Sequence, residues 1–289
     1  MRELAIILGF LLLSPLAPAA ARQTAAEAKL AGILAKAADY CRRLDKAALD
    51  FICTEYVEEE VNRATGPSAT RVEPGFTAWG GQHATKVMSA PVDSFRTTTF
   101  LYDYQFIRKG TEVTERRDLL EKNREKIKRE DAVPETKHFK FRDILFGASQ
   151  LLGESAAARH DYAIVKDDRI KGEPVVVISC APKAEFAGKV LSGRASVQAK
   201  DGAVLRIDWD PASFGSYSEV LAVAEKLKMP PAVESFTEFG AEKNGVRFPS
   251  RDVTEEAYGS GQTKFTRATT TIQYKGYKFF TVETESSIR

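Results

Sequence analysis

Histidine and cysteine are scarce in this chain, and their scarcity argues against several kinds of site. The three histidines (His83, His138 and His160) and three cysteines in 289 residues show no spacing typical of metal ligands. No Gly-x-Ser-x-Gly nucleophile elbow, phosphate-binding loop or dinucleotide fingerprint is present. We therefore expect no metal, no cofactor and no enzymatic activity.

A charge excess of either sign is also missing. The chain has 42 Lys and Arg against 40 Asp and Glu, and its most charged segment, Arg108 to Arg142, interleaves both signs. Because binding to nucleic-acid phosphates needs a basic surface, we expect no nucleic-acid partner. The close acid pairs Asp167 with Asp168 and Asp208 with Asp210 are interpreted as solvated turn and strand-edge residues, not as glycosidase carboxylates or calcium ligands.

A long apolar run is absent except at the start of the chain. Leu4 to Leu13 is apolar, and Ala19, Ala20 and Ala21 supply the small residues that signal peptidase requires, so we predict a cleaved signal peptide at 1–21. The run is shorter than the about 20 residues that span a bilayer, and no Cys stands at the cleavage point to receive a lipid. The sequence predicts an exported, periplasmic, non-lipidated monomer.

The rest of the chain, 22–289, reads as one domain in which a helix precedes many strands. Apolar residues recur at helical spacing from Thr24 to Leu49. Period-two patterns then predict strands over 50–63, 97–109, 112–122, 161–170, 174–181, 194–200, 203–210, 232–242, 246–258, 264–274 and 277–285. Two shorter helices are expected over 140–152 and 217–228.

The turns between these strands predict sequential antiparallel pairing. Turn residues that tolerate positive φ occur at Lys109-Gly110, Lys171-Gly172, Asp201-Gly202, Asn244-Gly245 and Gly259-Ser260-Gly261. We therefore expect an α+β fold with a strongly curved antiparallel sheet. The segment 64–94, rich in Gly, Pro, Ser and Thr, is expected to be a long mobile loop, which either gates a cavity or is a disordered excursion.

Three cysteines lie at positions 41, 53 and 180. In an oxidising compartment, a disulfide between Cys41 and Cys53 would join the helix to the strand that follows it. Cys180 would then be the odd, buried thiol in a Val-rich strand. The alternative is three free structural thiols.

Aromatic residues alternate along one strand. Phe100, Tyr102, Tyr104 and Phe106 share one face, and later strands repeat this pattern with Leu205, Ile207, Trp209, Ile272 and Tyr274. Two interpretations are open. These residues fill a packed core, or they line an apolar cavity on neighbouring strands of a curved sheet. In the second case all nine are ligand-binding residues.

The signal peptide, the single N-terminal helix, the strand meander and the hairpin from Gly193 to Trp209 together resemble the LolA-like lipoprotein-carrier superfamily. The runs Tyr102 to Gln105, Glu242 to Ser250 and Tyr277 to Val282 resemble those of uncharacterised exported bacterial members. The resemblance implies an unclosed β-barrel, with helices as a lid over an apolar cavity.

The function that the resemblance implies is binding and release of lipid, or of the acyl chains of lipoproteins, without covalent chemistry. Protein partners would be inner- or outer-membrane envelope proteins. The alternative is an envelope interaction or lipid-sensing module with a packed core. The third possibility is an exported hydrolase.

Overall fold

The computed structural model describes residues 19–47, 50–64, 72–76, 82–86, 94–109, 112–138 and 146–280. Most of the predicted signal peptide lies outside these residues. In chain order the elements are α1 (Ala19–Ala47), β1 (Asp50–Asn62), β2 (Val72–Phe76), β3 (Gln82–Lys86), β4 (Phe95–Lys109), β5 (Glu112–Lys122), β6 (Glu125–Arg129), α2 (Gly147–Leu152), η2 (Glu154–Ala156), β7 (His160–Ile170), β8 (Glu173–Pro182), η3 (Ala184–Phe186), β9 (Gly193–Val197), β10 (Val204–Trp209), η4 (Pro211–Ser213), α3 (Tyr217–Leu227), β11 (Glu234–Glu238), β12 (Ala241–Lys243), β13 (Val246–Phe248), β14 (Arg251–Tyr258), η5 (Gly261–Thr263) and β15 (Phe265–Phe279).

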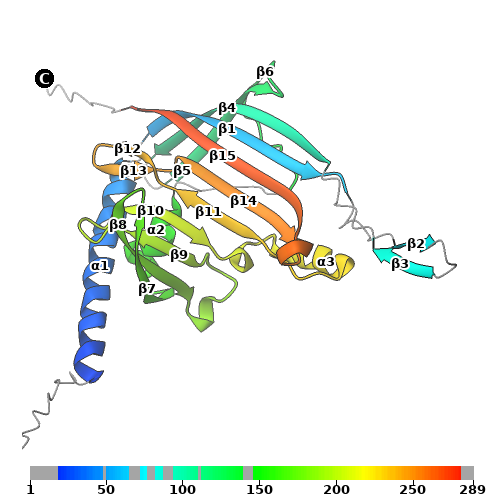
Figure 1. Ribbon diagram of the computed structural model, residues 1–289. Helices are drawn as coiled ribbons and strands as arrows, with labels where there is room; N and C mark the ends of the chain where they lie inside the picture. The colour runs from blue at the N-terminus through cyan, green and yellow to red at the C-terminus, as the bar shows by residue number, and fades with distance from the viewer. Residues whose placement is uncertain are drawn as a thin grey trace, which may run out of the picture.

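One large antiparallel sheet organises the molecule (Figure 1). Its eleven strands run in the order β6-β5-β4-β1-β15-β14-β11-β10-β9-β8-β7. Register shifts interrupt several of its strand pairs, and such bulges increase twist and bend the sheet. The order begins and ends with different strands, so the described sheet curves without closing. This confirms the predicted α+β fold, an unclosed curved sheet with an N-terminal helix and short helices.

The C-terminal strand β15 lies in the middle of this order, between β1 and β14. Its many β-branched residues, including Thr269 to Ile272, favour an extended strand. Two separate strands were expected here, 264–274 and 277–285, but β15 is continuous through Gly276 to Phe279. The predicted division into two strands was therefore wrong, and Gly276 lies inside β15. It has a φ of 68° within the strand, next to a register shift in the pairing with β1.

Within 64–94, the range expected as one loop, β2 and β3 pair as a separate two-stranded sheet. The linking residues 65–71, 77–81 and 87–93 lie outside the described part of the chain.

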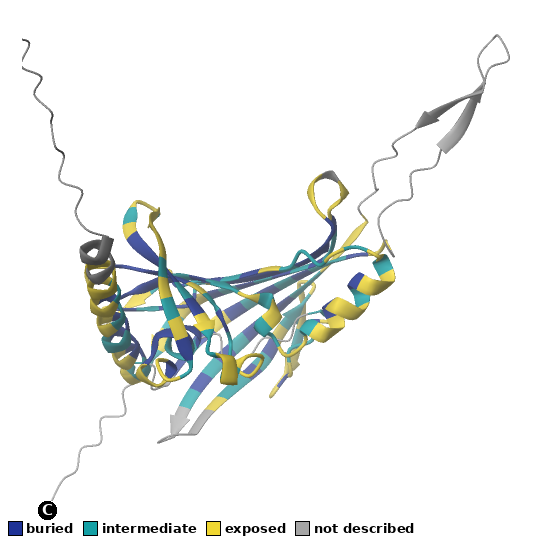
Figure 2. Ribbon diagram, turned by 90° about the horizontal axis from the view of Figure 1, so that it is seen from below, coloured by how far each residue is buried: buried dark blue, intermediate teal, exposed yellow. Residues whose placement is uncertain are grey.

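Helix α1 lies at one end of the large sheet and α3 toward the other (Figure 1). The apolar stripe of α1 is buried at Ile33, Ala37, Tyr40, Cys41 and Leu44, while residues 25–32 are mostly exposed (Figure 2). Several polar contacts join α1 to other elements. Lys29 pairs with Asp167 on β7, Lys36 donates to the carbonyl of residue 199, and the hydroxyl of Tyr40 accepts from the backbone of residue 247.

The side of the large sheet that packs against α1, α2 and the β12–β13 hairpin is called the inner face here. A single buried cluster joins it to both helices. A smaller cluster packs Val220 and Ala224 of α3 against Tyr258 and Phe265 at the far end of β14 and β15. No helix in the described part of the chain is both long and apolar enough to cross a membrane.

The Asp201-Gly202 turn predicted from the sequence lies directly against α1. Gly202 has a φ of 77°, and a Cβ there would lie 2.3 Å from the carbonyl oxygen of Lys36. We expect Gly202→Ala to lower the free energy of unfolding by about 2–3 kcal/mol, through backbone strain together with the clash. The control is Gly172→Ala, which has a φ of 85° and open space around the added methyl, and which should cost only the strain, about 1 kcal/mol. Denaturant unfolding of both variants measures this, and equal losses would contradict the close packing of α1 on the turn.

Candidate functional site on the inner face of the sheet

The aromatic row of β4 lies on the inner face, as the alternation predicted. Phe100, Tyr102, Tyr104 and Phe106 are each at most 4% exposed. The intervening residues, from Leu101 to Ile107, are only half-buried on the other face. The row is therefore interior, as both the packed-core and the cavity interpretations require.

The other predicted residues lie on the same face but farther away than expected. Ile272 and Tyr274 are on β15, and the rings of Tyr104 and Tyr274 lie 6.1 Å apart. Ile207 and Trp209 are on β10, which β1, β15, β14 and β11 separate from β4. The expectation that β4 and β10 are neighbours was wrong, because the C-terminal strands insert between them.

A continuous register row nevertheless connects β4 with β10 across the inner face. Each member is the cross-strand partner of the next: Phe100, Val57, Ile272, Asp252, Thr237 and Ile207. Five of these six side chains are uncharged, and Asp252 is the one carboxyl among them. The row shows that predicted residues from three strands face one interior.

Leu205 does not follow the predicted alternation. A register shift between Val204 and Arg206 places Val204 opposite Val197 and Ile207 opposite Ala195. Val204 and Ile207 therefore both join the inner-face cluster, and Leu205 is buried at the bulge. A bulge of this kind reverses the side of every residue before it, which explains the error.

Trp209 is covered by α2. A Cβ on Gly147, the first residue of α2, would lie 2.7 Å from the Trp209 ring, so the absence of a side chain there permits the contact. The indole nitrogen of Trp209 donates to the Thr237 hydroxyl at 2.9 Å. Trp209 thus links the covering helix to the middle of the inner face.

Sequence reasoning missed a band of buried polar side chains in the middle of this face. The band spans four adjacent strands and consists of Glu59, Ser235, Thr237, Asp252, Thr254, Glu256 and Thr270. Alternating polar residues in β11, β14 and β15 were the available signal. Such alternation normally indicates a solvated face, whereas here these residues are less than 9% exposed.

Hydrogen bonds connect part of the band. The Thr237 hydroxyl donates to Oδ2 of Asp252 at 2.5 Å, and the hydroxyls of Ser235 and Thr254 lie 2.8 Å apart. Burial raises the pKa of Asp252 to about 7, an effect that the Thr237 hydrogen bond only partly offsets. Thr270, 2% exposed, has no hydrogen-bond partner for its hydroxyl within the described structure.

A crossing segment, residues 131–138, covers the inner face next to this band. Oε1 of Glu59 accepts from the backbone nitrogens of Lys137 and His138 at 2.7 and 3.1 Å. The His138 ring lies 3.3 Å from Glu256, which also binds Arg267 at 2.7 Å. Burial alone would raise the pKa of Glu256, but its bonds with His138, Tyr258 and Arg267 lower it to about 2. Glu59 and Glu256 therefore hold the segment in place.

A buried ion pair lies beside the middle of the aromatic row, with Glu55 opposite Tyr102 and Arg117 opposite Tyr104. Arg117 of β5 makes a bidentate contact with Glu55 of β1, at 2.7 and 3.2 Å, and binds Glu115 at 3.1 Å. Its guanidinium carbon lies 4.7 Å from the centre of the Tyr104 ring. Phe51, Tyr104, Tyr274 and Tyr277 enclose a void of about 10 Å³ beside this pair, which holds at most one water.

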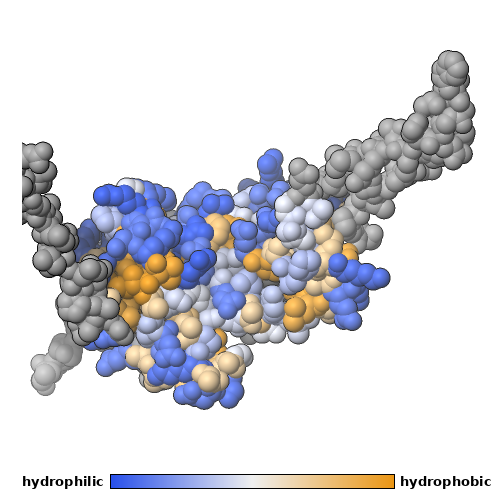
Figure 3. Space-filling view, turned by 60° about the horizontal axis from the view of Figure 1, so that its bottom comes forward, coloured by the Kyte–Doolittle hydropathy of each residue, from blue (hydrophilic) through white to orange (hydrophobic). Residues whose placement is uncertain are grey.

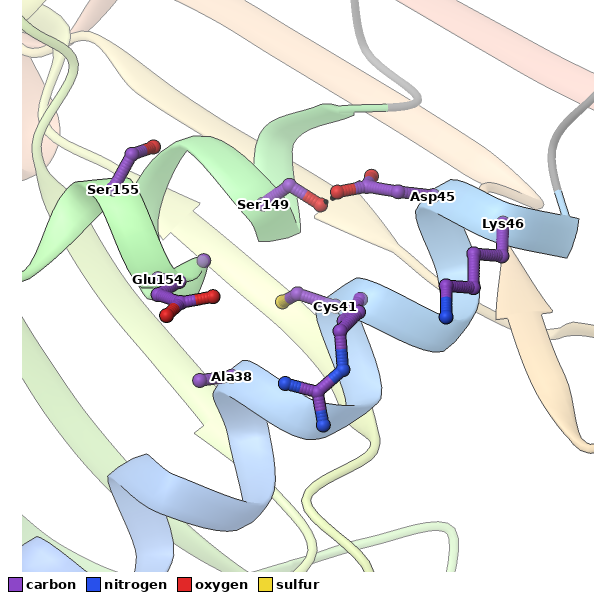
Figure 4. Close-up of a pocket in the computed structure, with 9 residues that line it drawn as sticks. Ala38, Cys41, Asp45, Lys46, Ser149, Glu154 and Ser155 are labelled. Carbon is purple, nitrogen blue, oxygen red and sulfur yellow. Dashed lines mark hydrogen bonds between the residues drawn. The ribbon is translucent and has the colours of Figure 1, made fainter.

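A groove of about 530 Å³ lies between α1 and α2 (Figure 4). Charged and hydroxyl side chains line much of it, and Asp45 accepts a hydrogen bond from Ser149 at 2.8 Å across it. None of the nine predicted ligand-binding residues is among those that line it. It is therefore separate from the inner-face site.

The predicted disulfide between Cys41 and Cys53 is not formed: all three cysteines are free and buried. Cys41 faces α2, where Ser149 and Asp45 influence its thiol, whereas Cys53 lies opposite Tyr104 and near Tyr277. The prediction assumed that α1 folds back over the start of β1. Instead α1 packs against α2, β13 and β7, so the open alternative of three free thiols describes the structure.

The histidine and the aspartates that were weighed as catalytic or ligand residues instead make hydrogen bonds and ion pairs that stabilise the fold. His160 lies between the carbonyls of residues 156 and 191, Asp208 pairs with Arg206, and Asp210 accepts from the backbone of residue 212. The side chain of His83 lies outside the described part. Within that part, no group of three or more His, Cys, Asp or Glu could hold a metal ion.

Comparisons with known proteins find similarity in structure only. No family model and no curated protein matches the sequence. A LolA superfamily protein from Nitrosomonas europaea is similar over 83% of this chain and 92% of its own, at 12% identity and a TM-score of 0.35. A domain assigned to outer-membrane lipoprotein sorting from Vibrio parahaemolyticus matches over 88% and 92%, at 12% identity and a TM-score of 0.34.

A DUF1329 family protein from Desulfovibrio piger is also similar, over 88% of this chain and 93% of its own, at 12% identity and a TM-score of 0.33. The superfamily that the sequence resembles is thus represented among these solved structures. At this identity and these TM-scores, the likeness carries no conclusion about what this chain binds.

Proposed function

We propose that this protein is an exported, non-enzymatic carrier that holds an acyl-bearing amphipathic molecule against the inner face of its curved sheet. The observation that supports this most is the division of that face. Apolar and aromatic rows flank a buried polar band, and covering elements lie over both. An amphipathic ligand matches such a division, because its chain would contact the apolar rows and its polar part the band.

Seen with the underside of the molecule turned forward, the exposed surface carries separate apolar patches with polar residues between them (Figure 3).

The alternative, an interaction or sensing module with a packed core, has its own support. Rings at the β1 end of the inner face pack closely, with Phe51 5.1 Å from Phe106 and Phe248 4.8 Å from Phe279. A packed interior of this kind would leave no room for a chain. An experiment that reports both binding and stability separates the two functions.

Binding of a fluorescent fatty-acyl probe to the full chain provides this test. We expect saturable binding of the probe, and we expect Ile272→Trp to weaken it at least about tenfold, because the larger ring fills space the chain would use, while the unfolding temperature falls little. Thr271→Trp, at the next position of β15 on the opposite face, is the matched control and should bind like the wild type. Absence of probe binding by the wild type, together with a marked loss of stability in Ile272→Trp, would favour the packed module.

A further inference from the structure

Asp252 is the carboxyl of the buried polar band that has the fewest partners in the described part of the chain. Its cross-strand partners are Ile272 on one side and Thr237 on the other. The Thr237 hydroxyl is its single hydrogen-bond partner in the described part of the chain, and no Lys, Arg or His there forms an ion pair with it. A buried carboxyl with one hydrogen bond retains several unused acceptor sites.

The other buried carboxyls of the band and its surroundings are satisfied. Glu55 has Arg117, Glu59 has two backbone nitrogens, and Glu256 has Arg267. Asp252 is therefore the exception, and at 8% exposure it too is a buried residue.

Hydroxyl groups next to Asp252 supply further acceptors. Thr254 and Thr270 form the adjacent cross-strand pair on the same face, and Thr254 contacts Ser235. Diagonal neighbours across an antiparallel pair lie within about 7–8 Å, so Thr270 is close to Asp252. Thr270 is 2% exposed and its hydroxyl has no hydrogen-bond partner within the described residues, which independently points to a polar partner from outside the chain at this place.

We propose that Asp252 and these hydroxyls bind the primary ammonium group of an amphipathic ligand whose chain lies along the apolar residues of the same face. An ammonium group has three donors, and the carboxylate of Asp252 with the oxygens of Thr254 and Thr270 offers matching acceptors. The aliphatic side chains of Ile272 and Ile207 continue the register row on either side of Asp252 and Thr237. A divalent cation fits poorly, because one carboxylate and neutral hydroxyls provide too little charge.

This inference rests on the proposed carrier function, and its test separates the two. Calorimetric titration of the full chain compares decylamine with decanol, which share the chain and differ in the charged donor group. We expect decylamine to bind about tenfold or more tightly than decanol to the wild type, because hydrogen bonds between charged groups are the stronger ones. Binding of neither compound would overturn the carrier function itself. Equal binding of both would overturn only the ammonium site.

Variants locate the site. Asp252→Asn keeps the shape and removes the charge, so the ratio of decylamine to decanol affinity should fall to near one while decanol still binds. Thr270→Val should reduce the ratio partly. The matched control, Asp208→Asn on β10, removes a carboxylate that pairs with Arg206 on the opposite face, and should leave the ratio unchanged. An unchanged ratio in Asp252→Asn would contradict the proposal.

The same titration with lysophosphatidylethanolamine and lysophosphatidylglycerol distinguishes two sources of the ammonium group. A preference for the ethanolamine lipid that Asp252→Asn abolishes would identify a phospholipid headgroup. A preference confined to decylamine would identify a simple long-chain amine.

Discussion

Replacing Arg117 with Met is expected to lower the free energy of unfolding by about 3–5 kcal/mol. The substitution keeps an unbranched, largely apolar side chain but leaves Glu55, which is 0% exposed, as a buried carboxylate without its bidentate partner. Removing one member of a buried ion pair costs more than the pair contributes, because the remaining charge stays desolvated. Denaturant unfolding at neutral pH measures the loss.

The adjacent residue provides a matched control. Arg116 points to the outer side of β5, where Asp118 and Asp131 surround a side chain that is 35% exposed. Arg116→Met should cost only about 0–1 kcal/mol, since exposed ion pairs contribute little. Similar losses in the two variants would show that the Glu55–Arg117 pair is hydrated rather than buried.

A double variant tests the cause. If the loss in Arg117→Met comes from the orphaned carboxylate, then Glu55→Gln in that background should recover a large part of it, because the neutral amide costs less to bury. Failure to recover would indicate that Arg117 acts mainly by packing on Tyr104, whose ring its guanidinium covers. The two explanations thus differ in whether Glu55→Gln restores stability in the Arg117→Met background.

Local patterns in the sequence predicted strands and turns well where the turn residues were ones that commonly adopt a positive φ. β5 has the predicted bounds, 112–122, and Asn244-Gly245 forms the predicted turn between β12 and β13. The expected strand 246–258 is divided into β13 and β14 at Pro249, which has no backbone N–H to donate. Strand β6 was missed because Asn123-Arg124 forms its turn with both residues at positive φ, and arginine is not a turn signal.

The order of the strands in the large sheet could not be predicted from local sequence patterns. The position of β15 between β1 and β14 joins the two ends of the chain, and no local pattern encodes such a pairing. This position explains why β4 and β10 are separated. It also explains why the aromatic half of the site was predicted and the polar half was not. Alternating Thr and acidic residues on β14 and β15 are typical of a solvated strand, and only the order of strands in the sheet shows that they lie in its middle.

Asp252→Asn is expected to stabilise the empty protein at pH 8 by up to about 4 kcal/mol. Burial raises the pKa of Asp252 from 3.8 to about 7, and each pKa unit corresponds to about 1.36 kcal/mol. The isosteric amide keeps a hydrogen-bonding partner for Thr237 and cannot ionise. The gain is therefore the cost of the buried negative charge that it removes.

The sign of the pH dependence follows from linkage. Between about pH 4 and pH 7 the folded state retains the Asp252 proton while the unfolded state loses it, so the contribution of this residue to stability falls as the pH rises through that window. The nearest other titratable group with a known influence, Tyr274 on β15, has its pKa raised by burial and does not ionise in this range. The difference between variant and wild type should therefore be small at pH 4, grow to pH 7 and remain constant above it.

Unfolding free energies of the wild type and Asp252→Asn at several pH values measure this difference, with Asp208→Asn as the control that should show no such slope. A pH-independent difference would mean that Asp252 is solvated or already neutralised by a cation. One further experiment tests both the buried charge of Asp252 and its binding of an ammonium group. Saturating decylamine should stabilise the wild type more than Asp252→Asn at pH 8, because a bound ammonium group removes the penalty that the empty site carries.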